Sequence, residues 1–268
     1  MSFLDRLFLQ LYRRKMRGAV RLAGWLGIGG NGGRLIRIRT RYGSRFDLDP
    51  FEYIDSHVLR EGFYESEVFE AALGAMPQNG MFWDVGANIG LHAVSMAHCL
   101  PGSRCVAFEP SPREFVRLAR SIELNSGRVQ ALPLGLSDQE ALLPFHVCQT
   151  NSGRNGLHAW GEQSMYTTTL ASIARADDLV DRGLLDAPNV VKIDVEGAEL
   201  AVLQGMTGIL ARPECRAIVI EAGLDALSRE HPINILLTNA GFQMRRLERR
   251  EQTSHDLDNF IAERVACS

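Results

Sequence analysis

From Met81 onward, short apolar runs alternate with stretches of helical periodicity, and this alternation constrains the fold more than any other feature. The apolar runs have the length of strands and lie at Met81–Val85, Cys105–Phe108, Val129–Leu134, Val190–Ile193 and Ala217–Ile220. The stretches between them predict helices at Leu91–Leu100, Pro112–Asn125, Glu199–Leu210 and His231–Ala240. Strands separated by helices pair in parallel, because each helix carries the chain back to the same edge. The sequence therefore predicts an α/β fold with a mostly parallel, doubly wound sheet and helices on both faces.

The other segments carry weaker patterns. We expect short helices near 51–60 and 65–75, irregular or β structure over 141–170, and a helix near 171–183. Two further strands are expected near 242–247 and 259–265.

Residues 1–45 differ from the rest of the chain in charge. They contain eleven Arg and Lys residues against one acid, Asp5, whereas residues 46–268 are strongly acidic. Apolar positions at three- and four-residue spacing predict one amphipathic helix over residues 3–26. A Gly-rich break and the start of a β-hairpin follow. We therefore divide the chain into a basic N-terminal extension, 1–45, and a main domain, 46–268.

Three uses of the basic helix remain open at this stage. It can cap the domain with its arginines in solvent, lie peripherally on an anionic membrane surface, or dock a partner or second subunit. The oligomeric state is not indicated by the sequence. Nucleic acid is not expected as a partner, because the main domain is acidic and the basic segment lacks interleaved aromatic residues for base stacking.

The composition is typical of a cytoplasmic protein. The five cysteines include no Cys-x-x-Cys pair and are odd in number, which favours reduced thiols. No apolar run approaches the roughly 18–20 residues that a membrane-spanning helix needs. We expect a cytoplasmic location, with contact to the inner face of the membrane as the alternative that the basic helix allows.

In a doubly wound sheet, ligands bind at the carboxyl ends of the strands, so the residues after each strand are the candidate site. The first strand leads into a glycine loop in which Gly86, Asn88 and Gly90 can bring backbone close to a cofactor. Asp84 begins this loop, and its carboxylate would repel a pyrophosphate but suit the amino group of S-adenosylmethionine. After the second strand, Glu109 is placed to accept hydrogen bonds from both ribose hydroxyls. Ser137, after the third strand, is a candidate contact for the adenine ring.

The fourth strand delivers the densest group of charged residues, Lys192-Ile193-Asp194-Val195-Glu196-Gly197-Ala198-Glu199. These carboxylates can hold the methionine end of the cofactor, remove a proton from an acceptor hydroxyl, or bind a divalent metal. Asp194, also a cofactor-binding candidate, and Glu196 are the first choices for catalysis, supported by Glu199 and Glu221. His92, near the cofactor loop, and His158 are weaker catalytic candidates.

Taken together, these segments resemble the FkbM-like family of S-adenosylmethionine-dependent methyltransferases. The match in order and spacing covers residues 45–250 and rests on five motifs, Gly62–Glu65, Asp84–Gly90, Phe108–Pro110, Lys192–Glu199 and Ile220-Glu221. The resemblance implies a Rossmann-like class I methyltransferase fold. It also implies methyl transfer from S-adenosylmethionine, most often to a hydroxyl of a sugar, glycolipid or secondary metabolite, so the partner would be a small-molecule, sugar or lipid-linked acceptor.

Two departures from the family pattern leave the acceptor open. Family members often carry an acid after the Thr-Leu that corresponds to Thr169-Leu170, where this chain has Ala171-Ser172. Segment 146–166 follows no recognised pattern.

Two other functions were weighed against methyl transfer. A nucleotide-dependent oxidoreductase would have a third glycine where Asn88 stands, and a non-catalytic scaffold would have lost cofactor motifs that are intact here.

Overall fold

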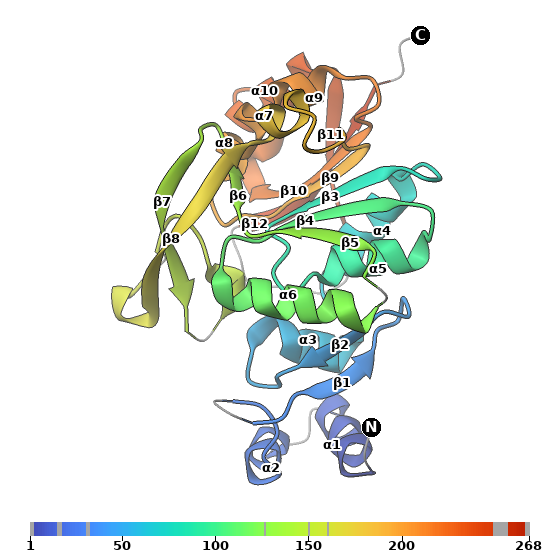
Figure 1. The fold of residues 1–268 in the computed structure, drawn as a ribbon, viewed down its shortest axis with the longest axis vertical. Coiled ribbons are helices and arrows are strands. Elements are labelled where there is room, and N and C mark those ends of the chain that lie inside the picture. Colours follow the sequence, from blue (N-terminus) through green and yellow to red (C-terminus); the bar gives the residue numbers. More distant parts are fainter. Residues whose placement is uncertain are drawn as a thin grey trace.

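The computed structural model describes residues 3–14, 18–30, 33–125, 127–149, 151–159, 161–248 and 257–265. A seven-stranded sheet forms its centre (Figure 1). The strands are β3 (Met81–Val85), β4 (Arg104–Phe108), β5 (Val129–Leu132), β9 (Val190–Ile193), β10 (Ala217–Gly223), β11 (Phe242–Arg246) and β12 (Leu257–Arg264). They are arranged in the order β11-β12-β10-β9-β3-β4-β5, and β12 runs antiparallel to both of its neighbours. The predicted α/β fold with a mostly parallel sheet is confirmed.

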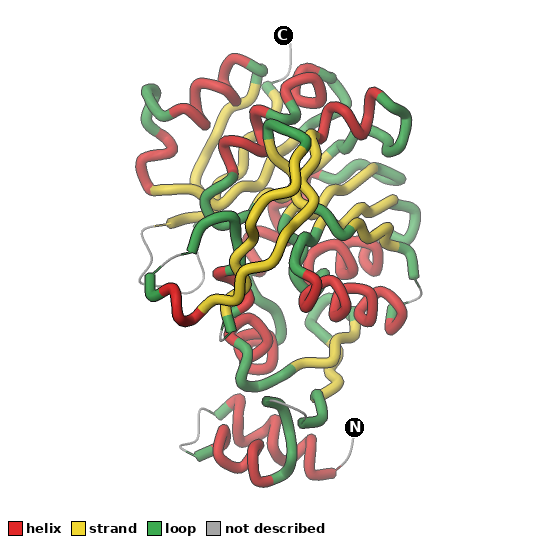
Figure 2. Tube along the Cα trace, turned by 60° about the vertical axis from the view of Figure 1, so that its left-hand side comes forward, coloured by secondary structure: helices red, strands yellow, loops and turns green. Residues whose placement is uncertain are grey.

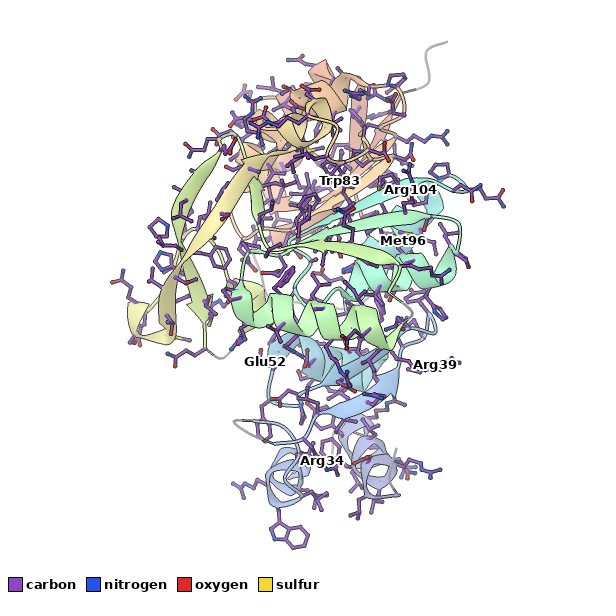
Figure 3. The ribbon with its side chains drawn as sticks, viewed as in Figure 1. Arg34, Arg39, Glu52, Trp83, Met96 and Arg104 are labelled. Atoms are coloured by element: carbon purple, nitrogen blue, oxygen red, sulfur yellow. The ribbon has the colours of Figure 1, made fainter. Side chains whose placement is uncertain are left out.

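Alternate residues of the central strands supply two separate cores. Phe82, on β3, belongs to the core beneath α4 (Ser66–Ala75), α5 (Leu91–Cys99) and α6 (Pro112–Leu124). Trp83, labelled in Figure 3, belongs to the core on the opposite face, beneath α7 (Ala176–Asp181), α8 (Glu199–Gln204), α9 (Thr207–Ala211) and α10 (Pro232–Asn239). Because both faces of the strands are covered, their sequences are almost continuously apolar. Helices on both faces are therefore confirmed.

A second, three-stranded sheet stands beside the central one. It consists of β6 (Gly135–Ser137), β8 (Tyr166–Arg175) and β7 (Ala141–Cys148), and the long β7–β8 pair crosses the front of the view in Figure 2. The connection between β7 and β8 contains the short 3-10 helices η1 (Ser152–Arg154) and η2 (Gln163–Met165). The β structure expected over 141–170 is confirmed.

Two predicted helices have different bounds in the structure. Residues 171–175 were expected to begin a helix but extend β8, because they pair with β7 on one side and β6 on the other, burying Ala171 and Ile173. The predicted helix Glu199–Leu210 is divided into α8 and α9 near Gly205, where the chain packs against the backbone of Ser137.

The basic N-terminal segment packs at one end of the molecule. It forms two helices, α1 (Phe3–Arg13) and α2 (Ala19–Trp25), so the prediction of a single helix over 3–26 is wrong. Gly18, before α2, has a φ of 89°, a conformation that a continuous right-handed helix excludes. The hairpin is confirmed as β1 (Ile36–Arg39) and β2 (Arg45–Leu48), and the helices expected near 51–60 and 65–75 are α3 (Tyr53–Glu61) and α4. The domain boundary at residue 45 stays a prediction.

Helix α3 connects this segment to the main domain. The Tyr12 hydroxyl donates to the Pro50 carbonyl at 3.2 Å, and Arg13 Nε donates to the Leu59 carbonyl at 3.1 Å. Phe8 is fully buried in the same core as Phe82. Within the described part of the chain, no helix combines the length and apolar character needed to cross a membrane.

The contact at Gly205 generates a stability prediction. Gly205 has a φ of −78°, which any residue adopts, but a Cβ there would collide with the Ser137 carbonyl oxygen. We expect Gly205→Ala to lower the free energy of unfolding by about 1–3 kcal/mol, because the collision displaces β6 from α8. Urea denaturation followed by circular dichroism measures the change.

Gly74→Ala is the matched control. Gly74 lies in α4 with open space around its Cα, so the same substitution should stabilise the protein by about 0.5–1 kcal/mol. Equal effects of the two substitutions would show that the Gly205 contact does not constrain the fold.

Candidate functional site

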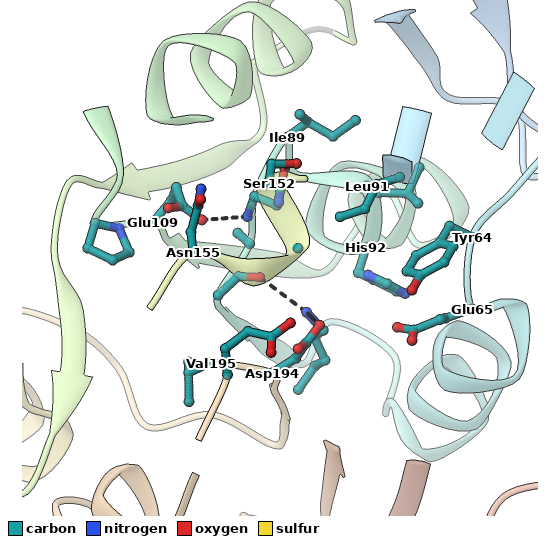
Figure 4. A pocket seen from close by; sticks show the side chains of 18 of the residues that line it. Tyr64, Glu65, Ile89, Leu91, His92, Glu109, Ser152, Asn155, Asp194 and Val195 are labelled. Carbon is teal, nitrogen blue, oxygen red and sulfur yellow. Dashed lines mark hydrogen bonds and ion pairs between the residues drawn. The ribbon is translucent and has the colours of Figure 1, made fainter. Parts of the chain in front are cut away.

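A cavity of about 670 Å³ lies at the carboxyl ends of β3, β4 and β9. Its wall includes the residues that follow these strands, together with residues from α3, the turn before α4, and η1. Figure 4 shows Glu109, Asp194 and Glu65 facing this cavity from three different elements. The location is the one that strand topology predicts for a ligand site.

The glycine loop after β3 is held tightly between the neighbouring strands. The N–H groups of Gly86 and Ala87 donate to the Phe108 carbonyl at 3.1 and 2.9 Å. Gly86 has a φ of 76°, and a Cβ there would collide with the Asp194 carbonyl oxygen, so a larger residue is excluded. Gly86 and Asn88 line the cavity, whereas Gly90 lies behind it at the start of α5.

Glu109 is fixed in the cavity wall by backbone donors. Its Oε2 accepts from the Asn88 N–H at 2.7 Å, and its Oε1 accepts from the Ser111 N–H at 2.8 Å. Burial raises the pKa of Glu109 to about 8. Both carboxyl oxygens therefore hold one orientation relative to the cavity before any ligand binds.

Lys192 is the centre of a buried ionic network. Its Nζ lies 3.0 Å from Asp194 Oδ2 and 3.6 Å from Asp84 Oδ1, and it donates to the Gly86 carbonyl at 3.2 Å. Burial alone lowers the pKa of Lys192, but the carboxylates of Asp194, Asp84 and Glu65 outweigh burial and raise it above its ordinary value. Lys192 therefore carries its charge inside the protein.

Asp84 lies behind the cavity wall. It is fully buried, and its Oδ2 accepts from the Ala93 N–H at 2.9 Å while Oδ1 faces Lys192. Burial raises its pKa, and Lys192 opposes that shift. Asp84 is not among the residues that line the cavity, so its direct contact with a cofactor stays a prediction, and its contacts in the structure position Lys192 and α5.

A cluster of carboxyl groups continues from Asp194 into a second, larger cavity of about 1710 Å³. Carboxylate oxygens of Asp194, Glu196 and Glu221 lie within 4.8 Å of one another, a spacing that can ligate a divalent cation. Burial, and then the Asp194 charge, raise the pKa of Glu65 to about 7, of Glu196 to about 8 and of Glu221 to about 9. Asp194, Glu196 and Glu65 line both cavities, which therefore meet at this cluster.

The structure separates the other predicted residues. His92 lines the first cavity against the Phe63 and Phe69 rings, and burial lowers its pKa well below the ordinary value. Glu199 lines the second cavity and accepts from the Gly197 N–H at 3.1 Å. Ser137 lines neither cavity and donates to Asp138, and His158 is exposed outside both. For His92, Glu199, Ser137 and His158, a role in cofactor binding or catalysis stays a prediction.

Several lining residues were not predicted as site residues from the sequence. Tyr64 and Glu65 belong to the Gly-x-Tyr-Glu motif, which was the available signal for them. Ser152 and Asn155 come from segment 146–166, and they reach the cavity only because the β7–β8 hairpin folds back over the central sheet. Asn155 is fixed there by donating from Nδ2 to Glu114 at 3.0 Å and accepting from the Cys148 N–H at 2.8 Å.

The fold and this site define the class as a Rossmann-like methyltransferase. A family profile described as the methyltransferase FkbM domain matches residues 84–261, and the chain belongs to this family. The predicted resemblance to the FkbM-like family is confirmed; of the five motifs, Gly62–Glu65 lies outside the matched residues.

Individual proteins are also similar to this chain. It is 32% identical over 212 residues to the hexuronic acid methyltransferase AglP of Haloferax volcanii, covering 78% of this chain and 84% of that protein. It is 27% identical over 193 residues to the methyltransferase sdnD of Sordaria araneosa, covering 60% and 74%. Among solved structures, precorrin-6Y C5,15-methyltransferase from Geobacter metallireducens is 17% identical with a TM-score of 0.47, covering 74% and 88%.

The raised pKa of Glu221 predicts how stability changes with pH. The folded protein keeps the Glu221 proton up to about pH 9, whereas the unfolded chain releases it near the usual value for glutamate, so this contribution to stability is lost as pH rises toward 9. Gln does not ionise, so Glu221→Gln should raise the Tm relative to wild type more at pH 9 than at pH 5. Differential scanning calorimetry at both pH values measures this difference.

Glu230→Gln, at an exposed position, is the control and should show no pH-dependent gain. If Glu221→Gln shifts Tm equally at pH 5 and pH 9, the protonated state assigned to Glu221 is wrong.

Proposed function

We propose that the protein transfers the methyl group of S-adenosylmethionine to a hydroxyl group of a sugar or sugar-containing metabolite. The observation that carries this proposal is the meeting of two cavities at Asp194 and Glu196. The first cavity has the features of a nucleoside site, and the second is larger and lined by several polar and charged side chains that suit a polar acceptor. When bound, S-adenosylmethionine supplies a methyl group on a positively charged sulfonium.

The residues of the first cavity fit this cofactor. Glu109 presents a carboxyl group whose orientation is fixed by two backbone donors, and it can accept from the two ribose hydroxyls. Gly86 lets backbone approach a ligand closely. The wall carries the Asp194 carboxylate, so its charge suits the ammonium and sulfonium groups and disfavours the pyrophosphate of a dinucleotide. This fit supports a methyltransferase over the oxidoreductase alternative.

The carboxyl cluster can accept the proton that the acceptor hydroxyl loses. Lys192 holds Asp194 at 3.0 Å, which fixes the carboxylate at the junction of the two cavities. We assign Asp194 as the proton acceptor. Glu196, with a pKa of about 8, is protonated at neutral pH and can donate a hydrogen bond that aligns the acceptor.

A divalent cation is a second way to activate the hydroxyl. Asp194, Glu196 and Glu221 would hold it, and it would lower the pKa of a bound hydroxyl. Dialysis against EDTA followed by addition of Mg²⁺ distinguishes the two cases, because base catalysis by Asp194 alone is unaffected by chelation.

The second cavity supports a sugar as the acceptor. Glu199 and Glu221 offer hydrogen-bond acceptors for hydroxyl groups, and Arg154 can pair with an acidic substituent. AglP, the archaeal relative, is by its name a hexuronic acid methyltransferase. A hexuronic acid is therefore the first acceptor to test.

Cofactor binding is predicted to depend on Glu109. Calorimetric titration with S-adenosylhomocysteine should give micromolar binding, and Glu109→Ala should weaken it by about 10- to 100-fold through loss of both hydrogen bonds to the ribose. NAD is the decoy and should not bind. Binding of NAD, or equal affinity of wild type and Glu109→Ala, would contradict the proposed cofactor site.

Turnover is predicted to depend on Asp194. Transfer of radiolabelled methyl to glucuronic acid or methyl glucoside should fall by about 10²–10⁴-fold in Asp194→Asn, the range expected for loss of a general base. Glu230→Gln should match wild type. S-adenosylhomocysteine binding to Asp194→Asn checks that the cavity persists, and near-normal turnover in this variant would remove Asp194 from the mechanism.

A further inference from the structure

The N-terminal segment contains a groove that the methyltransferase site does not use. The groove has a volume of about 1330 Å³ and lies between α1 and the β1–β2 hairpin. Of the nine described residues that line it, none is acidic and six are arginines, namely Arg6, Arg13, Arg14, Arg37, Arg39 and Arg45. Arg39 projects from the hairpin at the N-terminal end of the molecule (Figure 3).

Most of this positive charge is not neutralised by the protein. Arg37 pairs with Asp47 at 2.7 Å, and Arg13 donates to the Leu59 carbonyl. Among the described residues, no carboxylate lies within ion-pair distance of Arg6, Arg14 or Arg39. Exposed guanidinium groups that repel one another in a shared groove favour an anionic ligand with several charges.

Exposed apolar side chains also lie on the two N-terminal helices, one of which, α1, lines the groove. Leu4 and Leu7 on α1 are 48% and 42% exposed, and Trp25 on α2 is 83% exposed. Leu7 lies beside the basic stripe of α1, because Arg14 follows it by seven residues and Gln10 by three. The solvent-facing surface of α1 is therefore apolar along one edge and basic along the other.

We propose that this segment docks the protein on the surface of a membrane that contains anionic phospholipids. Lipid phosphates occupy the arginine groove, and Leu4, Leu7 and Trp25 enter the boundary between headgroups and acyl chains. Charge complementarity selects an anionic ligand, and the apolar edge selects a lipid surface over nucleic acid, which offers no apolar layer to Leu4 and Leu7.

The docking surface is rigidly attached to the main domain. The third face of α1 is buried through Phe8 and Tyr12; Tyr12 bonds to the chain just before α3, and Arg13 bonds to Leu59 within α3. Ile54, near the start of α3, lines both cavities. Docking would thus hold the cavities one helix away from the lipid surface. This position suits a lipid-linked sugar as the acceptor. The identity of the acceptor rests on the proposed function, whereas the docking does not.

Co-sedimentation of the full chain with vesicles tests the docking. Vesicles of phosphatidylcholine with phosphatidylglycerol should bind the protein, and vesicles of phosphatidylcholine alone should not. Arg14→Glu combined with Arg39→Glu should weaken binding at least about thirtyfold, because the loss of each basic residue near an anionic surface weakens binding about fivefold and the new carboxylates add repulsion. Arg182→Glu combined with Arg229→Glu changes the net charge equally at the other end of the molecule and should bind as wild type does.

A second variant separates lipid from other polyanions. Leu4→Ser combined with Leu7→Ser should weaken vesicle binding about tenfold or more while leaving any binding to heparin unchanged. Near-UV circular dichroism and S-adenosylhomocysteine binding confirm that each variant is folded. Failure of wild type to bind phosphatidylglycerol vesicles, equal binding by groove and control variants, or equal dependence of heparin and vesicle binding on Leu4 and Leu7 would overturn the proposal.

Discussion

The buried ammonium group of Lys192 joins the elements on which the site depends. It connects β9, which carries it, to Asp84 at the end of β3, to the Gly86 carbonyl in the loop that follows, and to Asp194 at the cavity wall. Burying a charged group without a partner of opposite charge costs several kcal/mol. Lys192 and the carboxylates of Asp84 and Asp194 therefore stabilise one another inside the protein. The network therefore fixes the glycine loop and Asp194 in one relative position.

The same network concentrates negative charge where the two cavities meet. Lys192 compensates Asp84 and Asp194, but Glu65, Glu196 and Glu221 gather around Asp194, and their raised pKa values record the cost of ionising them there. A cationic ligand at this position would lower these pKa values. The negative charge of Asp194 would therefore stabilise a sulfonium bound at this position.

The sequence predicted the strands that are buried on both faces of the sheet. β3 and β9 have the predicted bounds, because most of their residues, such as Val190, Val191 and Ile193, are apolar and buried on the two faces of a parallel sheet. Gly86, Glu109 and Asp194 were identified as candidates because topology alone places strand ends at one edge, and all three line the cavity.

Other features depend on contacts that sequence patterns do not contain. Ala171 and Ile173 lie in a strand because β6 and β7 bury them on either side, although their local pattern allows a helix. Asp84 looks like a ligand-binding carboxylate from its position, and only the packing of α5 and Lys192 places it behind the wall. Ser152 and Asn155 reach the cavity through the return of the long β7–β8 hairpin, which no spacing in segment 146–166 indicates.

The most direct test is a crystal structure of the protein with S-adenosylhomocysteine. We expect the ribose hydroxyls within hydrogen-bond distance of Glu109 and the thioether sulfur facing the Asp194 and Glu196 carboxyl groups, with the Lys192 network unchanged. A nucleoside bound outside the cavity at the ends of β3, β4 and β9, or a sulfur directed away from the second cavity, would contradict the assignment of this site to methyl transfer.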